Sequence, residues 1–208
     1  MPVLIKDGRS VLFIHIPKTA GTAVERSFER AGWSVHYKEN RRTHPETFDL
    51  LRCPPQHFQA SLLTEMFALK KFDLIFTTVR DPIARFRSEF TMRNRKLEEP
   101  PTSEQVDAWA ERVFRRYEVN PYMFDNHLRP QTEFLVPGAE VFRLEDRLET
   151  MYADLNARFD FGLDGRPRGL RSGNVTNLHS SEVPISPELT GYLRTRYAAD
   201  FRDLGYDS

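Results

Sequence analysis

The sequence predicts an α/β fold in which a central, mainly parallel sheet is covered by helices on both faces. The first observation is a set of short apolar runs rich in β-branched residues, at residues 11–16, 73–79 and 140–144, which is typical of buried strands. The second is that amphipathic segments lie between these runs. Buried strands that alternate with amphipathic helices indicate a parallel sheet packed between helices, because both faces of such a sheet have to be covered.

The ends of the elements carry their own signals. Pro17 stops the first strand, and the helix after it places Glu25 on its polar face. Asp81-Pro82 is typical of an N-cap followed by proline in the first helical turn. In chain order the predicted elements are a strand at 11–16, a helix at 20–31, a short strand at 34–37, a helix at 59–70, a strand at 73–79, a helix from 82 to about 94, a helix opened by the capping-box pair Thr102 and Gln105, a strand at 140–144, a helix starting near Asp146 and a last helix from Ser186 to about 200.

Composition bounds the size and class of the protein. The chain has 208 residues, 39% hydrophobic and 12% aromatic, which fits a single folded domain over residues 1–208 and excludes a disordered chain. Cys53 is the only cysteine, so a disulfide framework and a cysteine-rich zinc site are excluded.

The charges balance, with 30 Lys plus Arg against 30 Asp plus Glu. We therefore expect no broad basic face and no nucleic-acid partner, although local basic pockets fit this balance. No stretch of about 18 apolar residues is present, so no membrane span is expected. With no targeting segment and one cysteine, the expected location is cytoplasmic. The sequence predicts no particular oligomeric state.

A loop of small residues, Pro17-Lys18-Thr19-Ala20-Gly21-Thr22, follows the first buried strand. Small residues let a backbone wrap a bound anion, and the N–H groups and dipole at the start of the next helix favour negative charge. Lys18 adds a positive charge, and Thr19 and Thr22 add hydroxyl donors. The loop is a candidate phosphate-binding loop without the Walker A spacing. The alternative is an ordinary strand–turn–helix with a solvated lysine.

Arg80 ends the strand at 73–79, and Arg85 and Ser88 lie about one turn apart on the next helix. An arginine fork with a serine hydroxyl suits a second phosphate group. The alternative is that Arg80 pairs with Asp81 and Ser88 packs without a ligand. Because ligands of α/β sheets bind at the carboxyl ends of strands, the two features together are more specific than either alone.

Both motifs resemble those of the sulfotransferases. Phe13-Ile14-His15-Ile16-Pro17-Lys18-Thr19-Ala20-Gly21-Thr22 resembles their 5′-phosphosulfate loop, and Val79-Arg80-Asp81-Pro82-Ile83-Ala84-Arg85-Phe86-Arg87-Ser88-Glu89-Phe90 resembles their 3′-phosphate motif. The most similar group is the carbohydrate sulfotransferases that include heparan sulfate 2-O-sulfotransferase and the chondroitin and dermatan enzymes. With weaker matches, the resemblance covers residues 11–200.

The resemblance implies a P-loop-like three-layer fold and the co-substrate 3′-phosphoadenosine 5′-phosphosulfate (PAPS), with no metal. It places the loop Pro17, Lys18, Thr19, Ala20, Gly21 and Thr22 at the 5′-phosphosulfate. Arg80 and Ser88 would hold the 3′-phosphate, and Arg171 would add a contact to the 3′-phosphate or the adenine.

The resemblance also implies a catalytic base. In the 2-O-sulfotransferases the histidine that acts as catalytic base lies in a Gly-His-Val segment before the Arg-Asp-Pro strand. In this sequence His57, in Pro55-Gln56-His57-Phe58, occupies a similar place. Taking the proton of an acceptor hydroxyl suits a group with a near-neutral pKa. His127 is the rival, because its segment resembles the His-Trp-x-Pro segment of the chondroitin 4-O enzymes. It would either face the acceptor or organise the fold.

Other polar residues favour structural roles. Glu145 and Asp146 resemble an acidic pair of many sulfotransferases, and we favour a helix cap there. His15 lies in mid-strand, where a packed side chain is the expectation.

The predicted function is transfer of a sulfuryl group from PAPS to an acceptor hydroxyl. Golgi relatives carry a membrane anchor and disulfides that this chain lacks, so a carbohydrate precursor or small hydroxylated metabolite is a better expected acceptor than a long sulfated glycan. The alternatives are a non-catalytic nucleotide-binding module and an NTP-dependent phosphotransferase. The missing Walker A spacing disfavours the latter.

Overall fold

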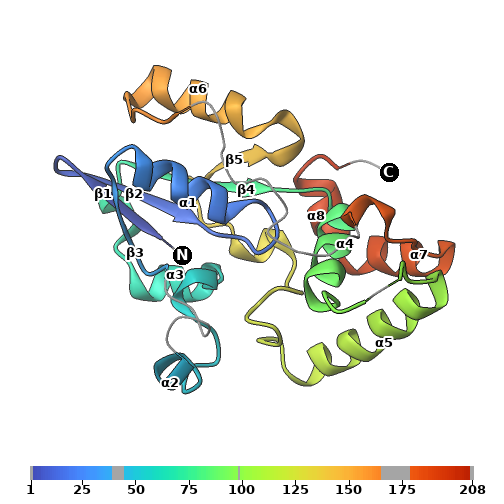
Figure 1. The fold of residues 1–208 in the computed structure, drawn as a ribbon. Coiled ribbons are helices and arrows are strands. Elements are labelled where there is room, and N and C mark those ends of the chain that lie inside the picture. The colour runs from blue at the N-terminus through green and yellow to red at the C-terminus, as the bar shows by residue number, and fades with distance from the viewer. Residues whose placement is uncertain (1, 39–44, 98, 165–178, 207–208) are drawn as a thin grey trace.

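A five-stranded sheet forms the centre of the protein (Figure 1). The computed structural model describes residues 2–38, 45–97, 99–164 and 179–206. The strand order is β3-β1-β2-β4-β5. The strands are β1 (Val3–Lys6), β2 (Arg9–Ile14), β3 (Ser34–His36), β4 (Leu74–Val79) and β5 (Glu140–Arg143).

The sheet is mixed, so the expectation of a mainly parallel sheet is wrong. The pairs β2–β4 and β4–β5 are parallel, whereas β1 pairs with both β2 and β3 in the antiparallel direction. The cause is an N-terminal hairpin that the sequence analysis missed. Asp7 and Gly8 have φ values of 50° and 76°, which a two-residue hairpin turn requires, and Asp-Gly between apolar runs is its usual signal.

Helices cover both faces of the sheet. On one face, α1 (Gly21–Arg30) and α6 (Leu148–Phe159) pack Phe28 and Tyr152 against Phe13 and Phe76. On the other face, α3 (Ala60–Met66) and the 3-10 helix η3 (Gln131–Phe134) contribute to a core with Leu12 and Ile14. An α/β fold with flanking helices is therefore confirmed.

A second group of helices gathers beyond the carboxyl end of β4 (Figure 1). It consists of α4 (Pro82–Arg93), α5 (Ser103–Val119), α7 (Pro187–Arg196) and α8 (Ala198–Asp203). Phe86 and Phe90 of α4 lie in one core with Trp109 of α5 and Leu193 of α7. The shorter elements are α2 (Pro45–Phe48), η1 (Pro55–His57), η2 (Leu69–Lys71), η4 (Leu144–Asp146) and η5 (Ser180–Glu182).

The predicted helix caps are confirmed at α4 and α5 and wrong at α6. The Asp81 carboxylate accepts a hydrogen bond from the Ala84 N–H at 2.7 Å, and Thr102 and Gln105 form a capping box. In contrast, α6 begins at Leu148 without a side-chain cap. Glu145 instead accepts hydrogen bonds from the Asp81 N–H and the Tyr206 hydroxyl at 2.9 Å each, because it faces the end of β4.

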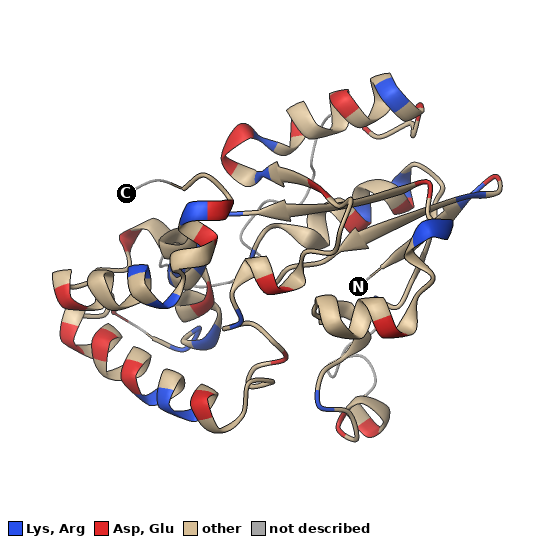
Figure 2. Cartoon of the chain, turned by 180° about the vertical axis from the view of Figure 1, so that it is seen from behind, with Lys and Arg blue, Asp and Glu red and all other residues tan. Residues whose placement is uncertain are grey.

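Charged residues are distributed over the described helices. Figure 2 shows Lys and Arg interspersed with Asp and Glu along them. Within the described part of the chain, no helix is both long and apolar enough to span a bilayer.

Candidate active site

The candidate phosphate loop joins the end of β2 to α1 and has an unusual backbone. Lys18 and Ala20 have φ values of 72° and 67°, a left-handed conformation that costs a non-glycine residue about 1 kcal/mol. Ala20 is the N-cap of α1 and provides no side-chain cap, unlike the N-caps of α4, α5 and α7. The first turn of α1 therefore keeps N–H groups that suit an anionic ligand.

Buried side chains hold this loop in shape. The Thr19 hydroxyl donates to the Ile16 carbonyl at 2.8 Å, and the Thr78 hydroxyl donates to the Thr19 carbonyl at 2.8 Å. Arg85 donates from Nε to the Pro17 carbonyl at 3.0 Å. The hydroxyl of Thr19 thus lies inside the protein and Arg85 is bound to backbone, whereas Thr22 is exposed.

Lys18 is a partly buried cation beside α4. Its Nζ lies 3.3 Å from the Met92 sulfur, and within the described residues it forms no ion pair. Burial lowers its pKa to about 8, although the nearby Glu89 carboxylate acts in the opposite direction. A lysine in this state gains an ionic partner when an anion binds in the loop.

Arg80 directly follows β4, and Ser88 lies in the second turn of α4, as the sequence predicts. The Gln131 side chain accepts from the Arg80 N–H at 2.9 Å and donates to the Arg80 carbonyl at 2.8 Å, so it fixes this turn of the backbone. Asp200 in turn accepts from the Gln131 N–H at 2.8 Å. Among the described residues the Arg80 guanidinium forms no ion pair, which leaves its charge for a ligand. Sequence reasoning missed Gln131 and Asp200.

Three histidines from distant parts of the sequence form a cluster. The ring centroids of His15 and His57 are 5.1 Å apart, and those of His57 and His127 are 4.9 Å apart, both in edge-to-face geometry. His57 therefore lies in the middle. Its Nδ1 is 3.1 Å from the Asp125 carbonyl, so the neutral ring donates there and keeps a lone pair on Nε2.

Each outer histidine of this histidine cluster binds a buried glutamate. The His15 Nδ1 is 2.5 Å from the Glu25 carboxylate, and the His127 Nδ1 is 2.6 Å from the Glu89 carboxylate. Glu89 also accepts from the Arg93 Nε at 2.7 Å. The sequence pattern placed Glu25 on the polar face of its helix, yet it is only 5% exposed. Pairs of this kind fix the tautomer and orientation of an imidazole.

The electrostatics of the cluster favour a neutral central histidine. Burial lowers the pKa of His57 well below its ordinary value, and the neighbouring His127 and His15 add to this effect. Burial also lowers the pKa of His127, but Glu89 acts against that shift. Burial opposes ionisation of Glu89, yet His127, Arg93 and Lys18 outweigh it and lower its pKa to about 2. His57 is thus neutral at neutral pH.

Gly21 joins the phosphate loop to the histidine cluster. A Cβ added at this position would lie 2.3 Å from the Cδ2 and 2.4 Å from the Nε2 of His15. A glycine is needed because the His15 ring rests directly on the first residue of α1. The loop and the three histidines are therefore parts of one site.

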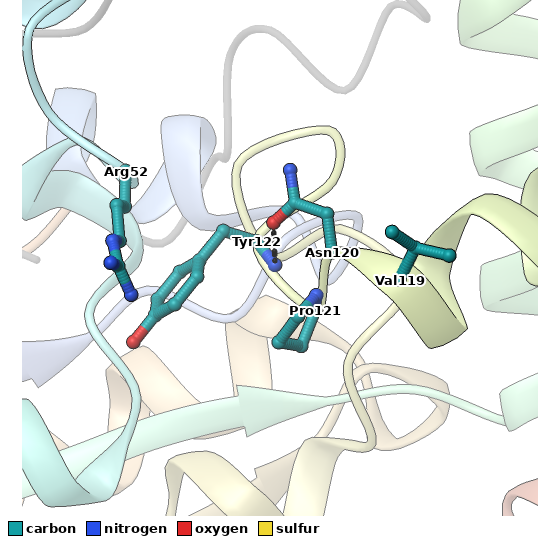
Figure 3. A pocket seen from close by; sticks show the side chains of 5 residues that line it. All are labelled: Arg52, Val119, Asn120, Pro121 and Tyr122. Carbon is teal, nitrogen blue, oxygen red and sulfur yellow. Dashed lines mark hydrogen bonds between the residues drawn. The ribbon is translucent and has the colours of Figure 1, made fainter.

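A pocket of about 380 Å³ is lined by residues from two chain segments, as Figure 3 shows. Its lining residues are Arg52, Val119, Asn120, Pro121 and Tyr122. The Gln59 amide donates to the Tyr122 hydroxyl at 3.2 Å, which ties one wall of the pocket to the start of α3. Arg52 precedes His57 by five residues and Tyr122 precedes His127 by five, but none of the three histidines lines the pocket.

Two further expectations concern ligands. Arg171 lies outside the described residues. Among the described residues, no three His, Cys, Asp or Glu side chains are grouped to hold a metal ion.

Comparison with known proteins gives one result. The sequence model of a family described as the sulfotransferase family matches residues 1–207. No individual curated protein and no solved structure matches the chain significantly.

Proposed function

Because this chain belongs to the sulfotransferase family, we propose that it transfers a sulfuryl group from PAPS to a hydroxyl of a carbohydrate or small hydroxylated metabolite. The observation that carries this proposal is the contact between Gly21 of the uncapped loop and His15 of the histidine cluster. It brings a site suited to an anionic donor next to a site suited to proton removal.

The donor would bind across two strand ends. Lys18 and the loop from Pro17 to Thr22 take the 5′-phosphosulfate, and the N–H groups at the start of α1 stabilise charge on the leaving phosphate. Arg80 and Ser88 take the 3′-phosphate, because the Arg80 guanidinium carries no ion pair among the described residues and Gln131 holds its backbone. Arg171 stays a proposed additional contact.

The acceptor would approach from the side of the histidine cluster. His57 removes the hydroxyl proton through Nε2 while the hydroxyl oxygen attacks sulfur in line with the leaving phosphate. The pocket lined by Asn120 and Tyr122 then holds the part of the acceptor that does not react.

We also propose that residues 1–208 form one P-loop-like, three-layer domain. We propose that it acts in a reducing, cytoplasmic compartment, which the single buried Cys53 supports.

Thermal unfolding with ligands tests donor binding. We expect adenosine 3′,5′-bisphosphate to raise the melting temperature and ATP with magnesium to have little effect. A large shift with ATP and none with the bisphosphate would identify a phosphotransferase instead. Binding of the bisphosphate without transfer to any of a broad panel of hydroxyl compounds would identify a binding module.

Substitutions test the chemistry. Lys18→Ala and His57→Ala should each lower kcat by about 100-fold or more. Lys70→Ala and His36→Ala are matched controls, because both side chains are exposed and lie outside the site. Activity near that of the wild type in either test variant contradicts the role of that residue.

A further inference from the structure

The proposed reaction releases one proton in each turnover, and the central histidine is largely buried. His57 is only 8% exposed and lies between His15 and His127. If His57 takes the acceptor proton, that proton has to leave the ring before the next cycle, and the two neighbouring histidines are the candidate carriers. The need to remove a proton from His57 rests on the proposed function.

Two routes lead away from His57, and they differ in what lies at their ends. On one side, the His15 ring rests on Gly21, and the Glu25 carboxylate is also bound by the buried Gln56 amide at 3.1 Å. On the other side, the His127 side chain is 11% exposed, compared with 7% for His15, and Glu89 binds Arg93, whose side chain is 31% exposed. The His15 route is closed by protein on each side, whereas the His127 route reaches towards the surface.

We propose that His127 receives the proton from His57 and passes it to solvent, and that Glu89 is the positioning residue that orients His127 for this relay. The acceptor O–H bond breaks as the O–S bond forms, and the S–O bond to phosphate breaks with its electron pair leaving on adenosine 3′,5′-bisphosphate. The proton moves to Nε2 of His57, then to Nε2 of His127, and then to water. The ring centroids of His57 and His127 are 4.9 Å apart, so the two rings are neighbours along this route.

The charges around the two rings favour movement in this direction. Burial and then the neighbouring His127 and His15 hold the pKa of His57 well below its ordinary range. His127 is also buried, but it faces Glu89 as well as the cations Arg93 and Lys18, and the carboxylate offsets part of the loss. A carboxylate behind an imidazole stabilises the imidazolium that forms, so the proton is held better at His127 than at His57.

Chemical rescue by imidazole tests the relay. In His127→Ala we expect kcat to fall by about 10- to 100-fold, with the KM for PAPS unchanged. Imidazole added to the buffer should restore kcat in proportion to its concentration, because it replaces the missing proton carrier. Glu89→Gln should show a smaller loss that imidazole also restores.

Glu25→Gln is the matched comparison, because it alters the histidine–glutamate pair on the opposite side of His57. Any loss of kcat in this variant should not respond to imidazole. If His127→Ala fails to bind adenosine 3′,5′-bisphosphate, His127→Asn replaces it, since its amide can still donate to Glu89.

The relay is wrong if a folded His127 variant keeps the wild-type kcat, or if imidazole restores none of its loss. It is also wrong if imidazole restores Glu25→Gln equally well. A wild-type protein that binds the bisphosphate but transfers no sulfuryl group to any acceptor contradicts the proposed function itself, which separates the two failures.

Discussion

At the scale of single residues, the surroundings of Lys18 set the pH range in which its side chain is charged. Burial lowers its pKa from 10.5 to about 8, against the effect of Glu89. A dianionic phosphate binds the ammonium form, so affinity for adenosine 3′,5′-bisphosphate should change little around pH 7, where both the phosphate charge and the ammonium are largely in place. Above pH 8 it should fall, approaching about tenfold per pH unit. Isothermal titration calorimetry from pH 7 to 9.5 measures this dependence.

Lys18→Arg provides the control for this titration, because a guanidinium stays protonated over the whole range. The variant should bind more weakly than the wild type at pH 7 but lose no further affinity up to pH 9.5. A wild-type affinity that is flat from pH 7.5 to 9.5 contradicts the assignment of Lys18 to the phosphate.

Sequence patterns located some site residues and missed others for a physical reason. Lys18 and Arg80 follow apolar strands directly, so local pattern alone places them at the same edge of the sheet. Glu25 and Glu89 lie on amphipathic helices, where a charged residue off the apolar stripe is expected to face solvent. Their burial depends on His15 and on His127, the latter 38 residues from Glu89, and no local pattern records such a partner.

At the scale of elements, the strand–loop–helix unit depends on the absence of a side chain at Gly21. Gly21→Ala would place a methyl group 2.3 Å from the His15 ring, so the ring or the start of α1 has to move. We expect a loss of about 1–3 kcal/mol in the free energy of unfolding and weaker binding of adenosine 3′,5′-bisphosphate. Denaturant unfolding and calorimetry measure the two effects.

Gly191 in α7 supplies the matched glycine. An added Cβ there meets no atom within 4 Å, so Gly191→Ala should stabilise the protein by about 0.5–1 kcal/mol through helix propensity alone. Equal effects of Gly21→Ala and Gly191→Ala on the free energy of unfolding contradict the packing of His15 on the candidate phosphate loop.

The same scale shows where element prediction succeeds. The strands β2, β4 and β5 are found because buried strands of a parallel unit are uninterrupted apolar runs. The strand expected at 34–37 is also present, as β3. The missed strand is β1, which has only four residues and no such run. Its antiparallel pairing with β2 follows from the Asp7-Gly8 turn, a signal of two residues.

In the whole molecule, the sheet, α4 and the segment around His127 are tied together at the site. Arg85 donates to the carbonyls of Pro17 at 3.0 Å and of His127 at 2.8 Å, and thereby joins the candidate phosphate loop to the histidine cluster. Asp200 of α8 binds the start of η3, which holds Arg80 through Gln131. The titratable groups between these layers therefore couple the stability of the fold to pH.

This coupling predicts a loss of stability in acid with two phases. His57 and His127 have pKa values below the ordinary 6.5, so the unfolded chain binds more protons than the folded one as the pH falls below 6.5. The free energy of unfolding should decrease by up to about 1.4 kcal/mol per pH unit for each histidine. Glu89 adds the second phase. Its folded pKa of about 2 lies below the ordinary 4.5, so its contribution to stability is present above pH 4.5 and is lost as the pH falls towards 2.

Urea unfolding at pH 7, 6 and 5 tests the first phase. The free energy of unfolding should depend less steeply on pH in His57→Asn, whose amide can still donate to the Asp125 carbonyl. The exposed His36→Asn should keep the wild-type slope, and equal slopes in both variants would mean that His57 is not held neutral in the folded protein.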